Sequence, residues 1–111
     1  MVSIKTAREL ALAFDEVVEE PHFEKSSFRI NKKIYTTLNE KDKRMTVRLS
    51  PLDQDVFCTF DKEVIHAVPN AWGKQGWTVI HLGKTDLPFV QDILQASYCN
   101  VAPKKLAAIY H

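Results

Sequence analysis

The sequence contains no apolar run near the ~18 residues that a membrane-spanning helix needs, so we expect no membrane association. Its first ten residues, MVSIKTAREL, lack the apolar core of a secretory signal peptide. Only two cysteines occur, Cys58 and Cys99, and their spacing fits neither a CxxC motif nor a zinc site. These absences predict a cytoplasmic protein with reduced thiols.

The short motifs of common catalytic sites are also missing. There is no HExxH, no GxSxG and no phosphate-binding loop, and no two histidines stand at ligand spacing on one predicted element. Cys58 or Cys99 with His66 or His81 is the conceivable nucleophile–base pair, but half-buried thiols are far more often structural. We therefore predict a non-enzymatic protein with no catalytic residue, no cofactor and no assigned metal ligand.

Glycine is scarce, with three residues in the chain, and two of them lie with both tryptophans in VPNAWGKQGW, residues 68–77. Gly73 and Gly76 predict a tight connection into the following strand, because glycine reaches positive φ at little cost. Two roles are open for the tryptophans. The favoured interpretation is that one of them closes the open end of a small core. The other is that an exposed indole beside Lys74 stacks on a base.

At 111 residues and 12.7 kDa, the chain is predicted to form one domain over residues 1–111. Its apolar share of 45% and charged share of 26% are those of a globular protein with a packed core. The net charge of +1 conceals a split. Residues 1–24 hold six acidic and two basic side chains, whereas residues 25–48 hold eight basic and two acidic ones. Local charge decides which partners a surface attracts, so the basic segment is a candidate binding surface.

Apolar residues recur at helical spacing near both ends of the chain. Residues 4–20 are predicted as the first helix, ended by Pro21, and residues 86–98 as the last long one. Ser50 followed by Pro51 is typical of a helix N-terminus and predicts a short helix that runs to about residue 60. Pro103 is expected to start a short terminal turn.

Alternating polar and apolar residues predict five strands, at residues 27–30, 32–39, 44–50, 64–68 and 77–82. In the second strand, Ile34 is expected to face the core, and Tyr35 to face away from it with the basic side chains. The order of elements is one helix, three strands, one helix, two strands and one helix. It predicts an α+β fold of two layers, an antiparallel sheet of about five strands with helices packed on one face.

Three segments of the sequence resemble the MmcQ/YjbR family of small bacterial proteins: PNAWGKQGWTV (69–79), SFRINKKIY (27–35) and SYCNVAPKK (97–105). The residues that carry this resemblance include Trp72, Gly73, Gly76, Trp77, Ser97 and Tyr98. The resemblance covers nearly the whole chain and implies a curved antiparallel sheet backed by helices, similar to bacterial frataxin and type III secretion chaperones. It also implies DNA binding through a double-wing arrangement, and it supplies no catalytic constellation.

Nucleic-acid binding, with DNA as the partner of a monomeric protein, is the leading functional prediction. Basic side chains on the sheet face opposite the helices would neutralise phosphates with little sequence selectivity. The same charges also suit a solvated sheet face that resists aggregation. The candidate nucleic-acid-binding residues are Arg29, Lys33, Tyr35, Lys41, Lys43, Arg44, Arg48 and Lys74.

An alternative is a non-enzymatic protein-interaction or metal-binding module at the acidic end of the first helix. Asp15, Glu16, Glu19 and Glu20 cluster there, and residues four apart share one side of a helix. Paired carboxylates can hold hard cations, although the same acids suit the solvated side of an amphipathic helix. A protein adaptor that works through the sheet face is the remaining interpretation.

Overall fold

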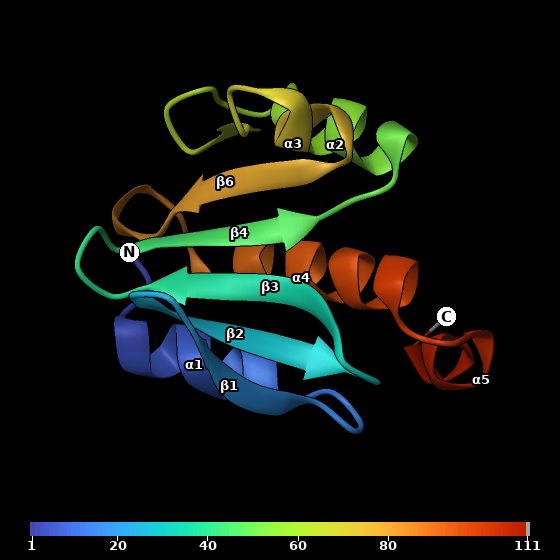
Figure 1. Ribbon diagram of the computed structural model, residues 1–111. Coiled ribbons are helices and arrows are strands. Elements are labelled where there is room, and N and C mark those ends of the chain that lie inside the picture. Colours follow the sequence, from blue (N-terminus) through green and yellow to red (C-terminus); the bar gives the residue numbers. More distant parts are fainter. Residues whose placement is uncertain (111) are drawn as a thin grey trace.

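The computed structural model describes residues 1–110 and confirms the predicted α+β fold, with an antiparallel sheet and helices packed on one face (Figure 1). Residue 111 of the predicted domain lies outside the described residues. The sheet has six strands in the order β1-β2-β3-β4-β6-β5. The strands are β1 (Val18–His22), β2 (Lys25–Ile30), β3 (Lys33–Asn39), β4 (Arg44–Arg48), β5 (Ile65–Ala67) and β6 (Trp77–His81).

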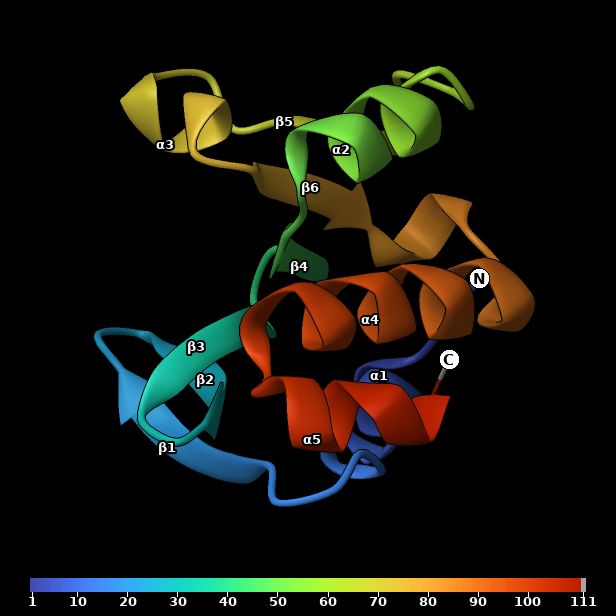
Figure 2. The same ribbon diagram turned by 90° about the vertical axis from the view of Figure 1, so that its right-hand side faces the viewer.

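The helices differ in length, and the longest covers the middle of the sheet. They are α1 (Ile4–Leu12), α2 (Pro51–Cys58), α3 (Ala71–Lys74), α4 (Leu87–Val101) and α5 (Lys104–Ala107), with short 3-10 turns η1 (Leu82–Lys84) and η2 (Ala108–Tyr110). Figures 1 and 2 show α1, α4 and α5 on the same side of the sheet. We call the opposite side, which these helices leave open, the outer face. No helix within residues 1–110 is long and apolar enough to cross a membrane.

The start of α2 is confirmed as predicted. Ser50 is the N-cap, and its side-chain oxygen accepts a hydrogen bond from the backbone N–H of Asp53 at 3.2 Å. Pro51 occupies the first helical position, where its missing N–H leaves no intrahelical bond unmade. The last long helix, α4, also extends a little past its predicted end, to Val101.

The prediction for the first helix is wrong beyond residue 12. The α1 helix ends at Leu12, Glu16 has a left-handed φ of 62°, and residues 18–22 form β1 at the edge of the sheet. Val18 pairs with Arg29 across the β1–β2 hairpin. The β-branched residues after the turn favour a strand, and pairing with β2 outweighs the apolar spacing that continued the helical pattern.

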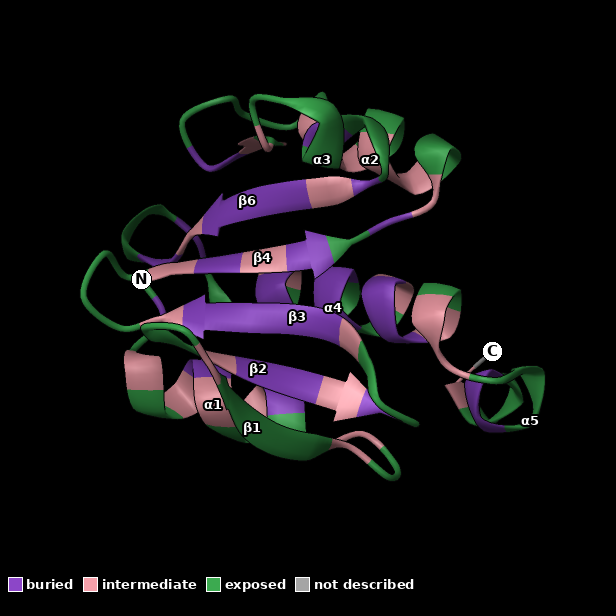
Figure 3. Ribbon diagram, viewed as in Figure 1, coloured by how far each residue is buried: buried purple, intermediate pink, exposed green. Residues whose placement is uncertain are grey.

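The core lies between the sheet and the helices α1 and α4, as the buried strands in Figure 3 show. Strand residues with fully buried side chains include Phe28, Ile30, Leu38, Met45, Val47 and Ile80. Their partners on the helices include Ala7, Ala11, Val90, Ile93, Leu94 and Tyr98. Each large apolar side chain buried here contributes roughly 1.5–3 kcal/mol, so this layer is the main source of stability.

A bulge between β2 and β3 reverses the predicted orientation of Tyr35. Phe28 pairs with Thr36 and Arg29 pairs with Ile34, which leaves Tyr35 as the extra residue. Because side chains alternate along a strand, the extra residue places Ile34 on the outer face and turns Tyr35 toward the helices. Tyr35 is fully buried there, and its hydroxyl donates to a backbone carbonyl of α1. Tyr35 therefore cannot contact a ligand on the outer face.

Candidate nucleic-acid interface

Four basic side chains lie on the outer face, two on β2 and two on β4. Lys25 and Arg29 alternate with the buried β2 residues, and Arg44 and Arg48 alternate with the buried β4 residues. The structure therefore places three of the predicted binding residues, Arg29, Arg44 and Arg48, on one face. Lys25 was not among the predicted set.

These basic residues differ in their acidic partners. The Arg44 guanidinium lies 2.9 Å from the Asp42 carboxylate. Arg29 lies 3.9 Å from the Glu20 carboxylate, and its Nε donates to the Ser27 hydroxyl at 3.0 Å. Among residues 1–110, neither Lys25 nor Arg48 forms an ion pair, so their charges are available to a bound anion.

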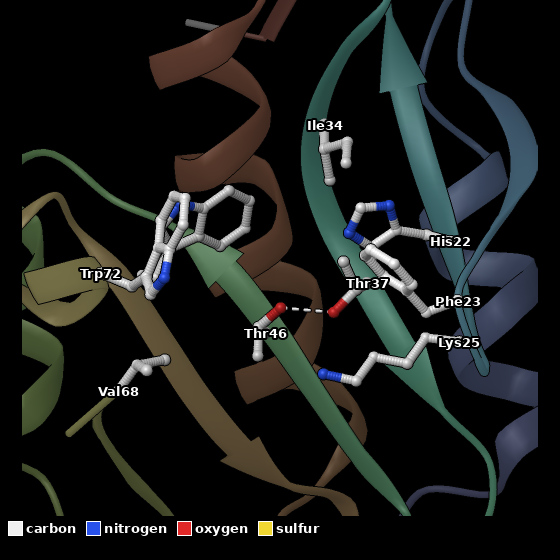
Figure 4. A pocket seen from close by; sticks show the side chains of 9 residues that line it. His22, Phe23, Lys25, Ile34, Thr37, Thr46, Val68 and Trp72 are labelled. Carbon is white, nitrogen blue, oxygen red and sulfur yellow. Dashed lines mark hydrogen bonds between the residues drawn. The ribbon is translucent and has the colours of Figure 1, made fainter. Parts of the chain in front are cut away.

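A trough of about 460 Å³ crosses the outer face, and apolar groups form most of its wall (Figure 4). Its floor is the hydrogen-bonded pair of Thr37 on β3 and Thr46 on β4. Trp72 lies on one side of this pair, and His22 and Phe23 lie on the other (Figure 4). The residues that line the trough are His22, Phe23, Lys25, Ile34, Thr37, Thr46, Val68, Trp72 and Trp77.

Neither tryptophan closes the core. Trp72, on α3, is 59% exposed, and Trp77, at the start of β6, is half-buried; both line the trough. The favoured interpretation of one buried, core-closing tryptophan is therefore wrong. The two indoles instead form an apolar wall on the outer face.

The two glycines of the motif are required by close backbone contacts. A Cβ built on Gly73 would lie 2.0 Å from the carbonyl oxygen of Val68. A Cβ on Gly76 would lie 2.1 Å from the carbonyl oxygen of Leu49, and Gly76 has a left-handed φ of 101°. The Gly76 carbonyl accepts from the Leu49 N–H at 2.9 Å. These contacts pack α3 and the turn after it closely against the backbone of Val68 and Leu49, and they position Trp72 at the outer face.

The other predicted binding residues do not join this trough. Lys33 pairs with Ile30 beyond the bulge, which places it on the helix side of the sheet. It lines a polar depression at the end of β4, which Arg48, the last residue of that strand, also borders. Lys41 and Lys43 are exposed at the tip of the β3–β4 hairpin, and Lys74 is exposed on α3.

The other two residues of the sequence signature, Ser97 and Tyr98, are buried on α4 and have structural contacts. The Ser97 hydroxyl lies 2.6 Å from the carbonyl oxygen of Tyr35 in the bulge. The Tyr98 hydroxyl donates to the backbone carbonyl of Asp15 at 2.6 Å, and burial raises its pKa to about 12. Ser97 thereby attaches α4 to the sheet, and Tyr98 attaches α4 to the turn that follows α1. Both contacts lie on the helix side of the sheet, away from the outer face.

Two histidines meet on the outer face beside the trough. The Nε2 atoms of His66 on β5 and His81 on β6 lie 3.0 Å apart. The pKa of His81 is lowered mainly because burial removes solvent from its ring, and the nearby His66, Arg44 and Lys84 lower it further. His81 is therefore less readily protonated than an ordinary histidine and contributes little positive charge to the face near pH 7.

The acidic residues near the end of α1 lose the geometry on which the alternative function depends. Because α1 ends at Leu12, Glu16 and Glu20 are not one helical turn apart. Glu19 instead lies 3.1 Å from Arg8. Within residues 1–110, no three histidine, cysteine or carboxylate side chains converge as metal ligands. Cys58 and Cys99 are both half-buried, and burial raises the pKa of each thiol.

Sequence reasoning missed one whole wall of the trough, the β1–β2 hairpin with His22, Phe23 and Lys25. The cause is the overextended first helix, which left Pro21 as a helix end rather than part of a strand. A usable signal was present: the β-branched pair Val17-Val18 precedes a proline that is tolerated at a sheet edge. Ile34 was missed because of the bulge.

Comparisons with known proteins agree with the fold. A sequence model of the YjbR family matches residues 12–100. The structure is similar to that of protein DR2400 of Deinococcus radiodurans, described as domain DUF419, with a TM-score of 0.76 and 16% identity over 90% of this chain and 78% of that one. No protein with a curated description matches the sequence. The family match spans most of the chain, which therefore belongs to the YjbR family.

Proposed function

We propose that the protein binds nucleic acid on the outer face of its sheet, and that it prefers single strands to duplex. The observation that carries this proposal is the apolar trough between aromatic walls, with basic side chains on the same face. An unpaired base has an exposed π-face, which stacks on an indole or phenyl ring whatever its sequence. A duplex keeps its bases stacked and cannot fill such a trough.

The positions of the basic side chains support a path in which a single nucleic-acid strand crosses the sheet. Lys25 lines the trough itself, and Arg48 pairs with Trp77 across β4 and β6. Both are without an acidic partner among residues 1–110 and are suited to phosphates on either side of a stacked base. Arg44, at the other end of β4, extends the basic surface beyond the trough.

The affinity should depend on salt because phosphate contacts release counterions. With about four phosphates neutralised, the slope of log affinity against log salt for a single strand is roughly −3. Fluorescence anisotropy of a labelled oligothymidylate and a labelled duplex, titrated at several salt concentrations, measures this slope. The single strand should bind more tightly at every concentration.

A charge reversal locates the surface. Arg44→Glu with Arg48→Glu should lower affinity for the single strand at least tenfold and flatten the salt slope. The matched control is Lys104→Glu with Lys105→Glu, which makes the same change in net charge on α5, away from the outer face. Equal losses in both variants would show that only net charge matters, and no binding at low salt would overturn the proposal.

A further inference from the structure

The helix α2 carries apolar side chains on the side that faces solvent as well as on the side that faces the core. Leu52, Val56 and Phe60 recur at intervals of four residues along α2 and its final turn, and they are 71%, 59% and 64% exposed. Leu52 and Val56 are four residues apart and share one face of α2, and Phe60 follows two residues past the end of the helix, so the three make up one exposed apolar stripe. We call this stripe the α2 patch. On the other side of α2, Phe57 and Cys58 are half-buried against the core, so this helix carries apolar residues on both of its sides.

Most of the contacts that hold α2 in place lie outside the patch. The Gln54 amide donates to the carbonyl oxygen of Gly73 at 2.9 Å and to the hydroxyl of Thr78 at 3.1 Å. Phe57 packs edge-on against Phe89 of α4, with ring centroids 5.9 Å apart. The side of α2 that faces the body is therefore held by the Gln54 amide and by Phe57 and Cys58, which pack against the core, and Phe60 also stacks on Phe89 with ring centroids 4.9 Å apart. Leu52 and Val56 take no part in these contacts, and Phe60 remains 64% exposed although one face of its ring meets Phe89.

Acidic residues outnumber basic ones on α2 and in the loop that follows it. Asp53 and Asp55 lie on α2, and Asp61 and Glu63 follow it in the loop, against the single basic residue Lys62. Asp53 also faces Asp92 of α4 across a depression of about 370 Å³ between the two helices. The surroundings of the patch are thus opposite in sign to the basic outer face.

We propose that the α2 patch binds a basic amphipathic helix of a partner protein. The apolar face of such a helix would cover Leu52, Val56 and Phe60, and its lysine and arginine side chains would meet the flanking carboxylates. Exposed apolar stripes that are rimmed by charge commonly mark protein interaction sites. A symmetric contact between two copies would instead bring like-charged carboxylates together, so a second copy fits this surface poorly.

The site is separate from the proposed nucleic-acid surface. The helix α2, which carries the patch, lies above α4 at one end of the molecule (Figure 2), whereas the trough lies on the outer face. The negative charge around the patch repels phosphates, so nucleic acid does not compete for it. The protein could hold both partners at once, and failure of one proposal would leave the other standing.

A labelled synthetic peptide of about 16 residues, with leucine on one helical face and lysine on the other, is the probe, because shorter helices are marginal in water. Its control is a scrambled peptide of the same composition. We expect the amphipathic peptide to bind at least tenfold more tightly than the scrambled one. Equal binding would show charge attraction alone and would overturn the proposal.

Variants of the protein locate the binding surface. Leu52→Ser with Val56→Ser should lower peptide affinity at least tenfold, whereas the exposed control pair Leu12→Ser with Ile109→Ser should leave it within twofold. Asp55→Asn with Glu63→Gln should weaken binding and its salt dependence. A loss that follows Glu19→Gln with Glu20→Gln instead would place the peptide on β1 and overturn the proposal.

Two further measurements keep the outcome unambiguous. Circular dichroism of each variant checks that the fold is retained, and backbone amide NMR shifts should move around residues 50–63 when the peptide is added. Sedimentation measures self-association. If the protein dimerises, and Leu52→Ser with Val56→Ser abolishes the dimer, the occupant is a second copy and the proposal of a basic partner is wrong.

Discussion

The hydroxyl oxygen of Ser97, on α4, lies 2.6 Å from the carbonyl oxygen of Tyr35 and 3.0 Å from the backbone nitrogen of Arg48. It donates to the Tyr35 carbonyl in the bulge and accepts from the Arg48 N–H at the end of β4. One buried side chain therefore links α4 to two neighbouring strands. It also fixes the backbone of Arg48, a basic residue of the outer face.

Replacement of Ser97 by alanine should destabilise the fold. The change leaves the Tyr35 carbonyl and the Arg48 N–H unsatisfied in the interior, at a cost of about 2–3 kcal/mol. Urea unfolding measures the loss in the free energy of unfolding. The control is Ser26→Ala, at a half-buried residue of β2, which should change the free energy of unfolding by less than about 0.5 kcal/mol. Similar losses in both would contradict the linking role of Ser97.

Gly76→Ala and Gly83→Ala should differ sharply in stability. At Gly76, an added Cβ meets the Leu49 carbonyl oxygen and the φ of 101° is unfavourable, so we expect a loss of at least about 2 kcal/mol. At Gly83, no atom lies within 4 Å of the added Cβ, and the substitution should be nearly neutral. Thermal unfolding of the two variants tests this contrast, which equal melting temperatures would contradict.

Stability should fall as the pH drops below about 6.5, the ordinary pKa of histidine. The pKa of His81 is lowered in the folded protein, so the unfolded chain takes up a proton at a pH where folded His81 does not. The stability contributed by neutral His81 is complete above that pKa and is lost as the pH falls toward the lower folded value. Urea unfolding of His81→Gln between pH 7.5 and 5 should show that its free energy of unfolding depends less steeply on pH than that of the unchanged protein. An unchanged slope would exclude this histidine as the cause.

Trp72→Ala should separate binding from stability. The indole is 59% exposed, so its loss should change the free energy of unfolding by less than about 0.5 kcal/mol. Loss of one stacking contact should weaken single-strand binding by about 1–3 kcal/mol. Anisotropy and urea unfolding on the same variant measure both quantities. If Trp72→Ala is destabilised but still binds the single strand with full affinity, Trp72 is a structural residue and not a stacking residue.

Local signals in the sequence predicted much of the fold. Ser50 and Pro51 define the start of α2, and the alternation in β4 correctly places Met45 and Val47 inward with Arg44 and Arg48 outward. These features depend on residues that are adjacent in the chain. Local preferences of the backbone and the periodicity of apolar residues are therefore sufficient to predict the start of α2 and the two faces of β4.

The candidate site was less predictable because it depends on contacts between distant segments. Phe23 and Trp72 face the same trough from the two ends of the sheet, and only the strand order brings them together. The bulge at Tyr35 inserts a residue that the alternating pattern does not mark. The sequence predicts the helix α2 but does not show which of its sides faces the body, so the exposure of Leu52 and Val56 was not predicted.

Tryptophan fluorescence during titration with an oligothymidylate at low salt tests the central claim most directly. A base stacked on Trp72 should quench its emission, so Trp77→Phe, which retains only Trp72, should show strong quenching. Trp72→Phe should show much less. Binding of the oligonucleotide with no change in the emission of Trp72, or no binding at low salt, would contradict the account of the outer face.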